Sequence, residues 1–166
     1  IAQYLRGIGK KVSGSDRLFD KDSKLTIQEQ FERQGIECFY QDASGVAEDV
    51  DVLVVSTAIE ESNVEYQKAI ALHIPIVKRS ELLASISRTK RTIAIGGTSG
   101  KSTTTAMAFH ILEQNGLSPS MMSGAGLTSL QEKGYPGNAW VGKSDWLVIE
   151  ADESDGSIVN YTSEIA

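Results

Sequence analysis

Short apolar runs alternate with amphipathic stretches along most of this sequence, which is the pattern of a parallel sheet covered by helices on both faces. The run at residues 51–57, DVLVVST, predicts a central strand that is buried on both faces. Residues 24–34 instead repeat apolar side chains at roughly helical spacing, so we expect a helix that ends at Gly35. The predicted fold class is α/β.

The remaining elements are predicted from apolar runs, caps and glycine turns. Strands are expected at residues 10–16, 36–40, 75–78, 92–97 and 146–151. Helices are expected after Asn63 through Leu72, from Ser80 onward, and from Thr103 to Gln114, where Asn115 and Gly116 end the helix. Residues 123–145 are rich in Gly, Ser and Lys and are expected to form a long loop or a hairpin.

A polar and basic segment at residues 86–92 separates two apolar blocks. We place a domain boundary there, with one domain at 1–88 and another at 89–166. The opening segment IAQYLRG has the character of the second half of a helix, and the closing segment has no capping or tail composition. We therefore expect both ends to be truncated.

Charge and cysteine content narrow the function classes. The net charge of -6 and the pI near 4.9 oppose a nucleic-acid-binding role, which normally needs a basic face. A single cysteine, Cys38, excludes an internal disulfide framework and is expected to be a small buried apolar group in a strand. No apolar run reaches the roughly 18–20 residues of a membrane span. We expect a cytoplasmic protein with small-molecule partners and no membrane insertion.

A glycine-rich loop between a predicted strand and a predicted helix is the main chemical signal. It consists of Gly97, Thr98, Ser99, Gly100, Lys101, Ser102 and Thr103. Such a loop can turn its backbone N–H groups inward as a nest for phosphate oxygens at a helix N-terminus. Lys101 could then span the β- and γ-phosphates of ATP, and the Ser102 hydroxyl could bind Mg²⁺. The loop is shorter than the usual Walker spacing, and the alternative is a plain glycine turn with an exposed lysine.

The predicted strand at 146–151 ends in an acidic cluster, EADESD, at residues 150–155. Because the carboxyl ends of parallel strands share one edge, Glu150 should lie near the glycine-rich loop and complete an oxygen-ligand Mg²⁺ site with Ser102. The alternative, a solvated acidic turn, applies best to Asp152 and Asp155 and remains open for Glu153.

Ser15 and Asp16 end an earlier predicted strand. An acidic residue at the end of such a strand commonly hydrogen-bonds ribose hydroxyls, although a carboxylate that caps a turn fits the sequence as well. His73 and His110 have no partners at metal-ligand spacing, so we interpret both as structural.

These motifs together resemble one family. GTSGKSTT is similar to the phosphate loop of Mur ligases, and EADESDGS is similar to the segment after their second ATPase strand. SGSD, STAI and PIVKRSELL resemble the N-terminal domain and interdomain link of the alanine-adding branch. The match is collinear over nearly the whole chain. It implies a Rossmann-like domain that holds a UDP-sugar at Ser15 and Asp16, followed by part of a P-loop ATPase domain with a mostly parallel sheet.

By this resemblance, the intact protein would be a three-domain ligase that uses ATP and Mg²⁺ to join UDP-N-acetylmuramate to an amino acid or peptide. Lys101 would act on the transferring phosphoryl group. A glycine-rich motif is expected just before Ile1, and a metal-binding histidine is expected beyond Ala166. Ser99 stands where the alanine-adding and recycling branches usually have histidine. A peptide-adding recycling ligase and a non-catalytic nucleotide-binding protein therefore remain as alternatives, and the oligomeric state is open.

Overall fold

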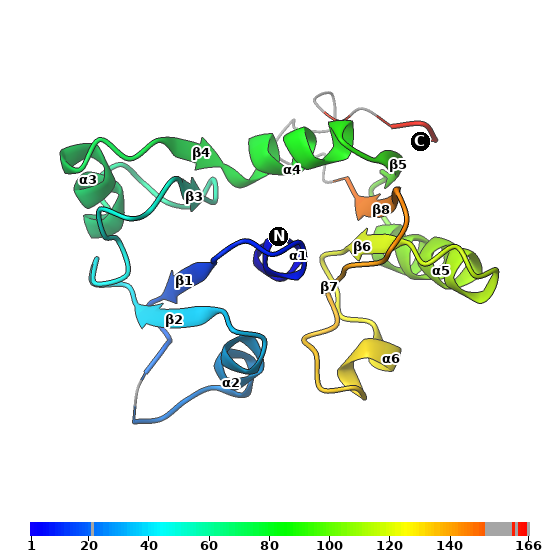
Figure 1. Ribbon diagram of the computed structural model, residues 1–166, viewed down its shortest axis with the longest axis horizontal. Helices are drawn as coiled ribbons and strands as arrows, with labels where there is room; N and C mark the ends of the chain where they lie inside the picture. The colour runs from blue at the N-terminus through cyan, green and yellow to red at the C-terminus, as the bar shows by residue number, and fades with distance from the viewer. Residues whose placement is uncertain (21, 152–160, 162, 166) are drawn as a thin grey trace. The chain divides into compact units, whose positions relative to one another are not determined.

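Helices and short parallel strands alternate along the chain in the computed structural model, as the hydrophobic pattern predicts. The structure describes residues 1–20, 22–151, 161 and 163–165. They form two compact units, Ala2–Leu82 and Leu83–Ala166, and Ile1 belongs with the second (Figure 1). The division falls within α4 (Arg79–Arg88). The domain boundary between residues 88 and 89 stays a prediction.

Besides the start of α4, the described part of the first unit contains the helices α1 (Ala2–Gly7), α2 (Thr26–Arg33) and α3 (Val64–Ala71). Gly35 follows the end of α2 with a φ of 75°, and its N–H donates to the carbonyl of Glu32 at 2.9 Å. Asn63 caps α3 because its side-chain oxygen accepts the N–H groups of Glu65 and Tyr66. Both predicted helix ends are confirmed.

Strands of the first unit form two parallel pairs. β1 (Ser13–Asp16) pairs with β2 (Glu37–Tyr40), and β3 (Leu53–Val55) pairs with β4 (Ile76–Lys78). The prediction of a central strand buried on both faces at residues 51–57 is wrong. β3 has three residues, all half-buried, and β4 is its strand partner among the described residues. Leu53 packs on the apolar cluster around Ala69 of α3. Packing of one face of the strand on this cluster accounts for the apolar character of the run.

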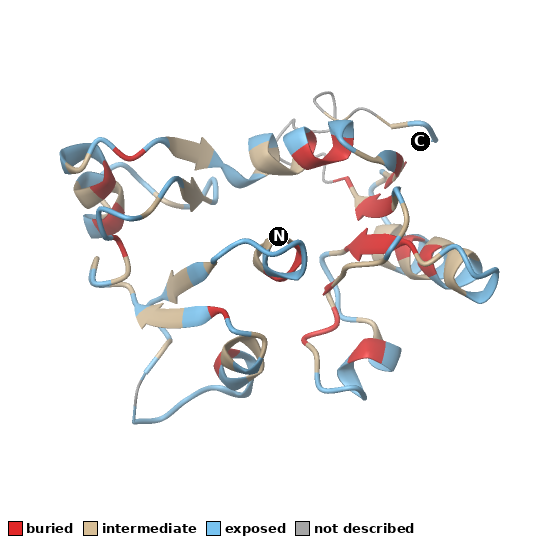
Figure 2. Ribbon diagram, viewed as in Figure 1, coloured by how far each residue is buried: buried red, intermediate tan, exposed pale blue. Residues whose placement is uncertain are grey.

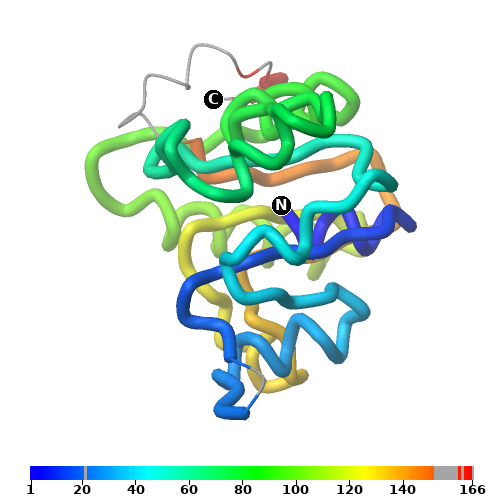
Figure 3. Tube along the Cα trace, turned by 90° about the vertical axis from the view of Figure 1, so that its left-hand side faces the viewer, coloured from blue at the N-terminus to red at the C-terminus, as the bar shows by residue number. Residues whose placement is uncertain are grey.

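The second unit contains a sheet in the order β5-β8-β6-β7. Its strands are β5 (Arg91–Ile95), β8 (Trp146–Glu150), β6 (Ser120–Met122) and β7 (Ala139–Trp140). Pairing is parallel except between β6 and β7. In Figure 3, β6 (yellow) and β8 (orange) run side by side as neighbours in the sheet. The expected loop or hairpin at 123–145 contains α6 (Thr128–Gln131) and β7, and β7 pairs back onto β6.

Helix α5 (Lys101–Gln114) packs on this sheet through a buried cluster of Phe109, Met121, Leu130 and Val148. Figure 2 shows buried residues concentrated in β6 and β8. α5 ends at Asn115 and Gly116, as predicted, and begins two residues before the predicted start. The core therefore fixes α5 against the strands whose carboxyl ends carry the polar residues.

Helices in the described part of the chain are all too short or too polar to cross a membrane.

Candidate functional site

The glycine-rich loop connects the carboxyl end of β5 to the first turn of α5, which is the context that a phosphate-binding loop requires. Gly97 and Gly100 have φ angles of 130° and 80°, in the region that side chains other than glycine avoid. Gly100 occupies the N-cap position of α5 and offers no side-chain cap to the helix. The first N–H groups of α5 are therefore oriented to receive an external anion.

Lys101 folds back over this loop. Its Nζ donates to the carbonyl oxygen of Gly97 at 2.6 Å, and the residue is half-buried. The ammonium group thus lies against the first residue of the loop that runs from Gly97 to the start of α5. A plain turn with an exposed lysine does not describe this arrangement.

Glu150 ends β8 beside the loop. The register pairs it with Ile95, the last residue of β5, so the two strand ends lie next to each other. The Ser102 hydroxyl donates to the Glu150 carboxylate, at 3.0 Å from Oε2 and 3.2 Å from Oε1. The structure brings together the two residues that the sequence predicted as metal ligands.

Two further residues, Ser123 and Gly124, contact the same carboxylate and were missed by the sequence analysis. The Ser123 hydroxyl lies 3.0 Å from Oε2 of Glu150, and the Gly124 N–H donates to that atom at 2.8 Å. Both residues directly follow β6, the neighbour of β8 in the sheet. The signal that could have revealed them is a strand at 120–122, which the short apolar stretch there did not make apparent.

This arrangement suits a magnesium nucleotide. Uncapped amides and an ammonium group can neutralise phosphate, and a carboxylate beside a hydroxyl is the oxygen donor set that Mg²⁺ prefers. No group of three or more His, Cys, Asp and Glu side chains gathers to hold a metal among the described residues. A magnesium ion here would take its remaining ligands from phosphate and water. Asp152, Glu153 and Asp155 lie outside the described residues.

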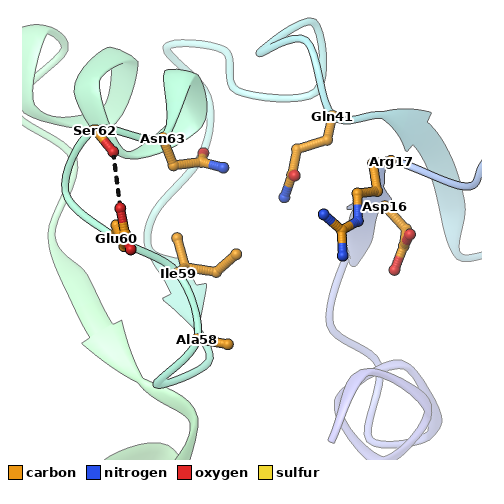
Figure 4. A pocket seen from close by; sticks show the side chains of 8 residues that line it. All are labelled: Asp16, Arg17, Gln41, Ala58, Ile59, Glu60, Ser62 and Asn63. Carbon is orange, nitrogen blue, oxygen red and sulfur yellow. Dashed lines mark hydrogen bonds between the residues drawn. The ribbon is translucent and has the colours of Figure 1, made fainter.

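A pocket of about 390 Å³ lies in the first unit (Figure 4). Its lining residues are Asp16, Arg17, Gln41, Ala58, Ile59, Glu60, Ser62 and Asn63. One wall comes from the ends of β1 and β2, and the other comes from the segment between β3 and α3. Ligands of open α/β sheets bind at this position, outside the carboxyl ends of the strands.

The predicted residues Ser15 and Asp16 have different surroundings. Asp16 lines the pocket, and its Oδ1 also accepts the N–H of Leu18 at 2.9 Å, so the turn-capping alternative holds for one of its oxygens. Ser15 lies beside the pocket lining and donates its hydroxyl to Oε2 of Glu65 at 2.6 Å. Arg17 lines the pocket and was missed, although an arginine directly after SGSD offered the signal.

The remaining residues singled out from the sequence are His73, His110 and Cys38. His73 and His110 are exposed, and neither lines the pocket or contacts the glycine-rich loop residues through an observed hydrogen bond. Cys38 is half-buried in β2, where burial raises the pKa of its thiol.

Comparison with known sequences gives one consistent family. The profile of the Mur ligase family, catalytic domain, matches residues 1–91. The UDP-N-acetylmuramate--L-alanine ligases of Mesorhizobium japonicum and Chelativorans sp. are 40% and 39% identical to this chain over all 166 residues. These residues make up 34% of each relative, so the chain spans about a third of their length.

Solved structures agree with the sequence relatives. The UDP-N-acetylmuramate-alanine ligase of Thermotoga maritima matches 98% of this chain with a TM-score of 0.83 and 26% identity, over 36% of its own length. The UDP-N-acetylmuramate:L-alanyl-gamma-D-glutamyl-meso-diaminopimelate ligase of Neisseria meningitides matches 93% with a TM-score of 0.76 and 25% identity, over 48% of its length. The predicted combination of a Rossmann-like domain with mostly parallel sheets is confirmed.

Proposed function

This chain belongs to the Mur ligase family, and we propose that it forms the nucleotide-binding part of an ATP-dependent ligase that joins UDP-N-acetylmuramate to L-alanine in peptidoglycan precursor synthesis. The observation that carries the reaction type is the convergence of Lys101, Ser102 and Glu150 at the end of one sheet. The choice of substrates rests on the relatives at about 40% identity.

In the proposed reaction, a carboxylate oxygen of the muramyl group attacks the γ-phosphorus of ATP, and ADP leaves. The amine of L-alanine then attacks the acyl phosphate, an amide bond forms and inorganic phosphate leaves. Phosphoryl transfer of this kind depends mainly on positioning and on neutralising negative charge. The backbone N–H groups of residues 97–103 would hold the phosphates, and Lys101 would neutralise charge on the transferring group.

The cofactor we propose is Mg²⁺, with Ser102 and Glu150 as its protein ligands. The fit rests on the Ser102 hydroxyl and the Glu150 carboxylate, which lie within 3.2 Å of each other on the loop side of the sheet. When bound, the ion would neutralise the charge of the ATP phosphates. Ser123 and the Gly124 N–H would hold the Glu150 carboxylate in place through Oε2.

The pocket in the first unit is proposed to hold the nucleotide of the UDP-sugar. Asp16 could accept hydrogen bonds from ribose hydroxyls, and the side-chain amides of Gln41 and Asn63 could pair with the polar edge of uracil. Arg17 supplies a cation for a phosphate group. We further propose that the enzyme works in the cytoplasm, where ATP and UDP-sugars are available.

A peptide-adding ligase is the second candidate. The fold similarity to the Neisseria enzyme supports it, whereas the serine at position 99 departs from the usual histidine of both branches and does not choose between them. Both candidates share the pocket and the phosphate loop, so the amine distinguishes them. The test measures phosphate release by the full-length protein from ATP with UDP-N-acetylmuramate and either L-alanine or the tripeptide L-alanyl-γ-D-glutamyl-meso-diaminopimelate.

We expect phosphate release that depends on both UDP-N-acetylmuramate and L-alanine. If phosphate is released with the tripeptide but not with L-alanine, the second candidate is favoured. If no phosphate is released with either amine, a non-catalytic nucleotide-binding protein is favoured. The 166-residue chain by itself is expected to show no ligase turnover, since it spans about a third of the length of its relatives. Turnover by the chain alone would contradict that expectation.

A further inference from the structure

A partly buried hydrogen bond joins the two walls of the pocket in the first unit. The Ser15 hydroxyl of β1 donates to Oε2 of Glu65 in the first turn of α3, with an oxygen-to-oxygen distance of 2.6 Å. Asp16 and Asn63 line opposite walls of the pocket (Figure 4), and Ser15 and Glu65 lie one and two positions from them in the sequence. The bond therefore connects segments that lie 50 residues apart in the sequence.

Glu65 is an unusual residue to bury. Its exposed fraction is 7%, and a buried carboxylate is costly unless hydrogen bonds and a favourable field compensate for lost water. The N-terminus of α3 supplies the field, and Asn63 accepts the backbone N–H of Glu65, so the main chain there is already satisfied. The Ser15 hydroxyl supplies the side-chain hydrogen bond.

The same hydrogen bond uses the one proton that the Ser15 hydroxyl can donate. Ser15 is not among the residues that line the pocket, whereas its neighbours Asp16 and Arg17 are. A hydroxyl has one proton to donate, and in Ser15 that proton is directed at Glu65. A direct contact from Ser15 to a nucleotide would have to compete with a short hydrogen bond to a charged acceptor, which is among the stronger kinds.

We propose that Ser15 and Glu65 are positioning residues that hold the two walls of the nucleotide pocket at their observed separation. This inference rests on the proposed function, since it assigns the pocket to the UDP-sugar. The pair would act through Asp16, Arg17 and Asn63, which face the ligand. Loss of the pair should lower the affinity for the UDP-sugar and leave ATP binding at the glycine-rich loop unchanged.

The test measures steady-state kinetics of the full-length ligase and the dissociation constant for UDP by calorimetry. The variants are Ser15→Ala, Glu65→Ala, the double variant, and Glu65→Gln, which keeps an acceptor oxygen for the Ser15 hydroxyl. Glu61→Ala is the matched control, because it removes an exposed carboxylate from the segment before α3. Melting temperatures accompany each variant.

We expect each single alanine variant to raise KM for UDP-N-acetylmuramate and Kd for UDP by about tenfold, as loss of one charged hydrogen bond would. KM for ATP and kcat should stay unchanged, and Glu65→Gln should bind nearly as the wild type does. The double variant should bind UDP no more weakly than the single variant with the lower affinity, because both changes break the same hydrogen bond.

A direct contact between Ser15 and the ligand predicts another pattern. Ser15→Ala would then weaken binding while Glu65→Ala behaved like Glu61→Ala, and that result would overturn the proposal. If Glu65→Ala does not fold, Ser15→Ala is compared with Glu65→Gln instead. Wild-type affinity of Ser15→Ala for UDP would then overturn the proposal as well. Failure of the wild-type protein to bind UDP or UDP-N-acetylmuramate would instead refute the proposed function.

Discussion

The Ser102 hydroxyl lies 3.0 Å from Oε2 of Glu150, although 48 residues separate the two along the chain. Parallel pairing of β5 with β8 produces this proximity, because Ile95 and Glu150 are partners at the ends of their strands. The glycine-rich loop leaves β5 at that point, and α5 begins with Lys101 and Ser102. One strand register therefore places the proposed phosphate and metal ligands together.

Replacing Lys101 by alanine should abolish phosphoryl transfer. The ammonium group would no longer neutralise the transferring phosphoryl group, and we expect kcat to fall at least about a hundredfold. The fold should be retained, since the observed side-chain bond of Lys101 goes to a carbonyl of the loop itself. Activity and melting temperature are compared with those of Lys143→Ala, an exposed lysine of the same unit. Unchanged activity would refute the phosphate-loop assignment.

Replacing Glu150 by glutamine should act through the metal. Glutamine can present its oxygen to Ser123 and Gly124, as Oε2 does now, so the melting temperature should change little. Loss of the charge should lower the rate about tenfold or more and raise the Mg²⁺ concentration that gives half-maximal rate. Asp152→Asn, which lies outside the described residues, should have a much smaller effect if that residue only caps a turn.

The measurement for both variants is rate against Mg²⁺ concentration, together with direct Mn²⁺ binding in the presence of ATP. Equal effects from the two variants would show that the acidic cluster has been misinterpreted. A large loss of stability in Glu150→Gln with normal metal dependence would show the same.

Ser123 should make a smaller contribution to the same metal site. In Ser123→Ala the Gly124 N–H still holds Oε2 of Glu150, so we expect a rise of only a few-fold in the required Mg²⁺ and little change in kcat at saturation. Ser129→Ala, an exposed serine of α6, serves as the control. A metal requirement equal to that of the control would mean that Ser123 does not help to orient Glu150.

Gly142 should not tolerate a side chain. A Cβ at this position would overlap the backbone carbonyls of Ser118 and Pro119, which cannot move as a flexible side chain can. We expect Gly142→Ala to lower the free energy of unfolding by about 1–3 kcal/mol. Denaturant unfolding measures it against Gly14→Ala, where an added Cβ meets nothing within 4 Å. Similar stability of the two variants would contradict the close approach of these backbones.

The Cys38 thiol should react slowly with alkylating reagents. Burial raises the pKa of Cys38 above its usual value of 9.0, and the nearby Glu32 carboxylate adds to the shift. A raised pKa leaves less thiolate at a given pH, so the alkylation rate should reach half of its plateau at a higher pH than it does in the unfolded chain. The same measurement in denaturant supplies the reference, and identical pH profiles in both conditions would contradict the prediction.

Sequence reasoning was most successful where a motif carries its own geometry. The glycine-rich loop needs only a strand before it and a helix after it, and Glu150 follows an unmistakable apolar strand. Ser123 was missed because β6 has three residues, and so short a strand produces no periodic signal. The burial of residues 51–57 was overestimated, because an apolar run does not reveal how many neighbouring strands or helices cover it.

The first unit shows another limit of sequence reasoning. Asp16 ends a strand, and strand ends can be located from the sequence. The bond between Ser15 and Glu65 depends on how β1 and α3 approach each other, and no local pattern in SGSD or NVEY encodes that distance. The predicted UDP-sugar-binding roles of Ser15 and Asp16 stay predictions.

The three groups that meet Oε2 of Glu150 come from distant segments, since Ser102, Ser123 and Gly124 lie 48, 27 and 26 residues away in sequence. No short piece of the chain can assemble this cluster by local folding, and each loop closure costs entropy before the contacts form. A one-residue slip between β5 and β8 would turn Glu150 to the opposite face of the sheet. Competence to bind metal should therefore appear late in refolding, together with the cooperative closure of the sheet, and should be lost as early as any other property during unfolding.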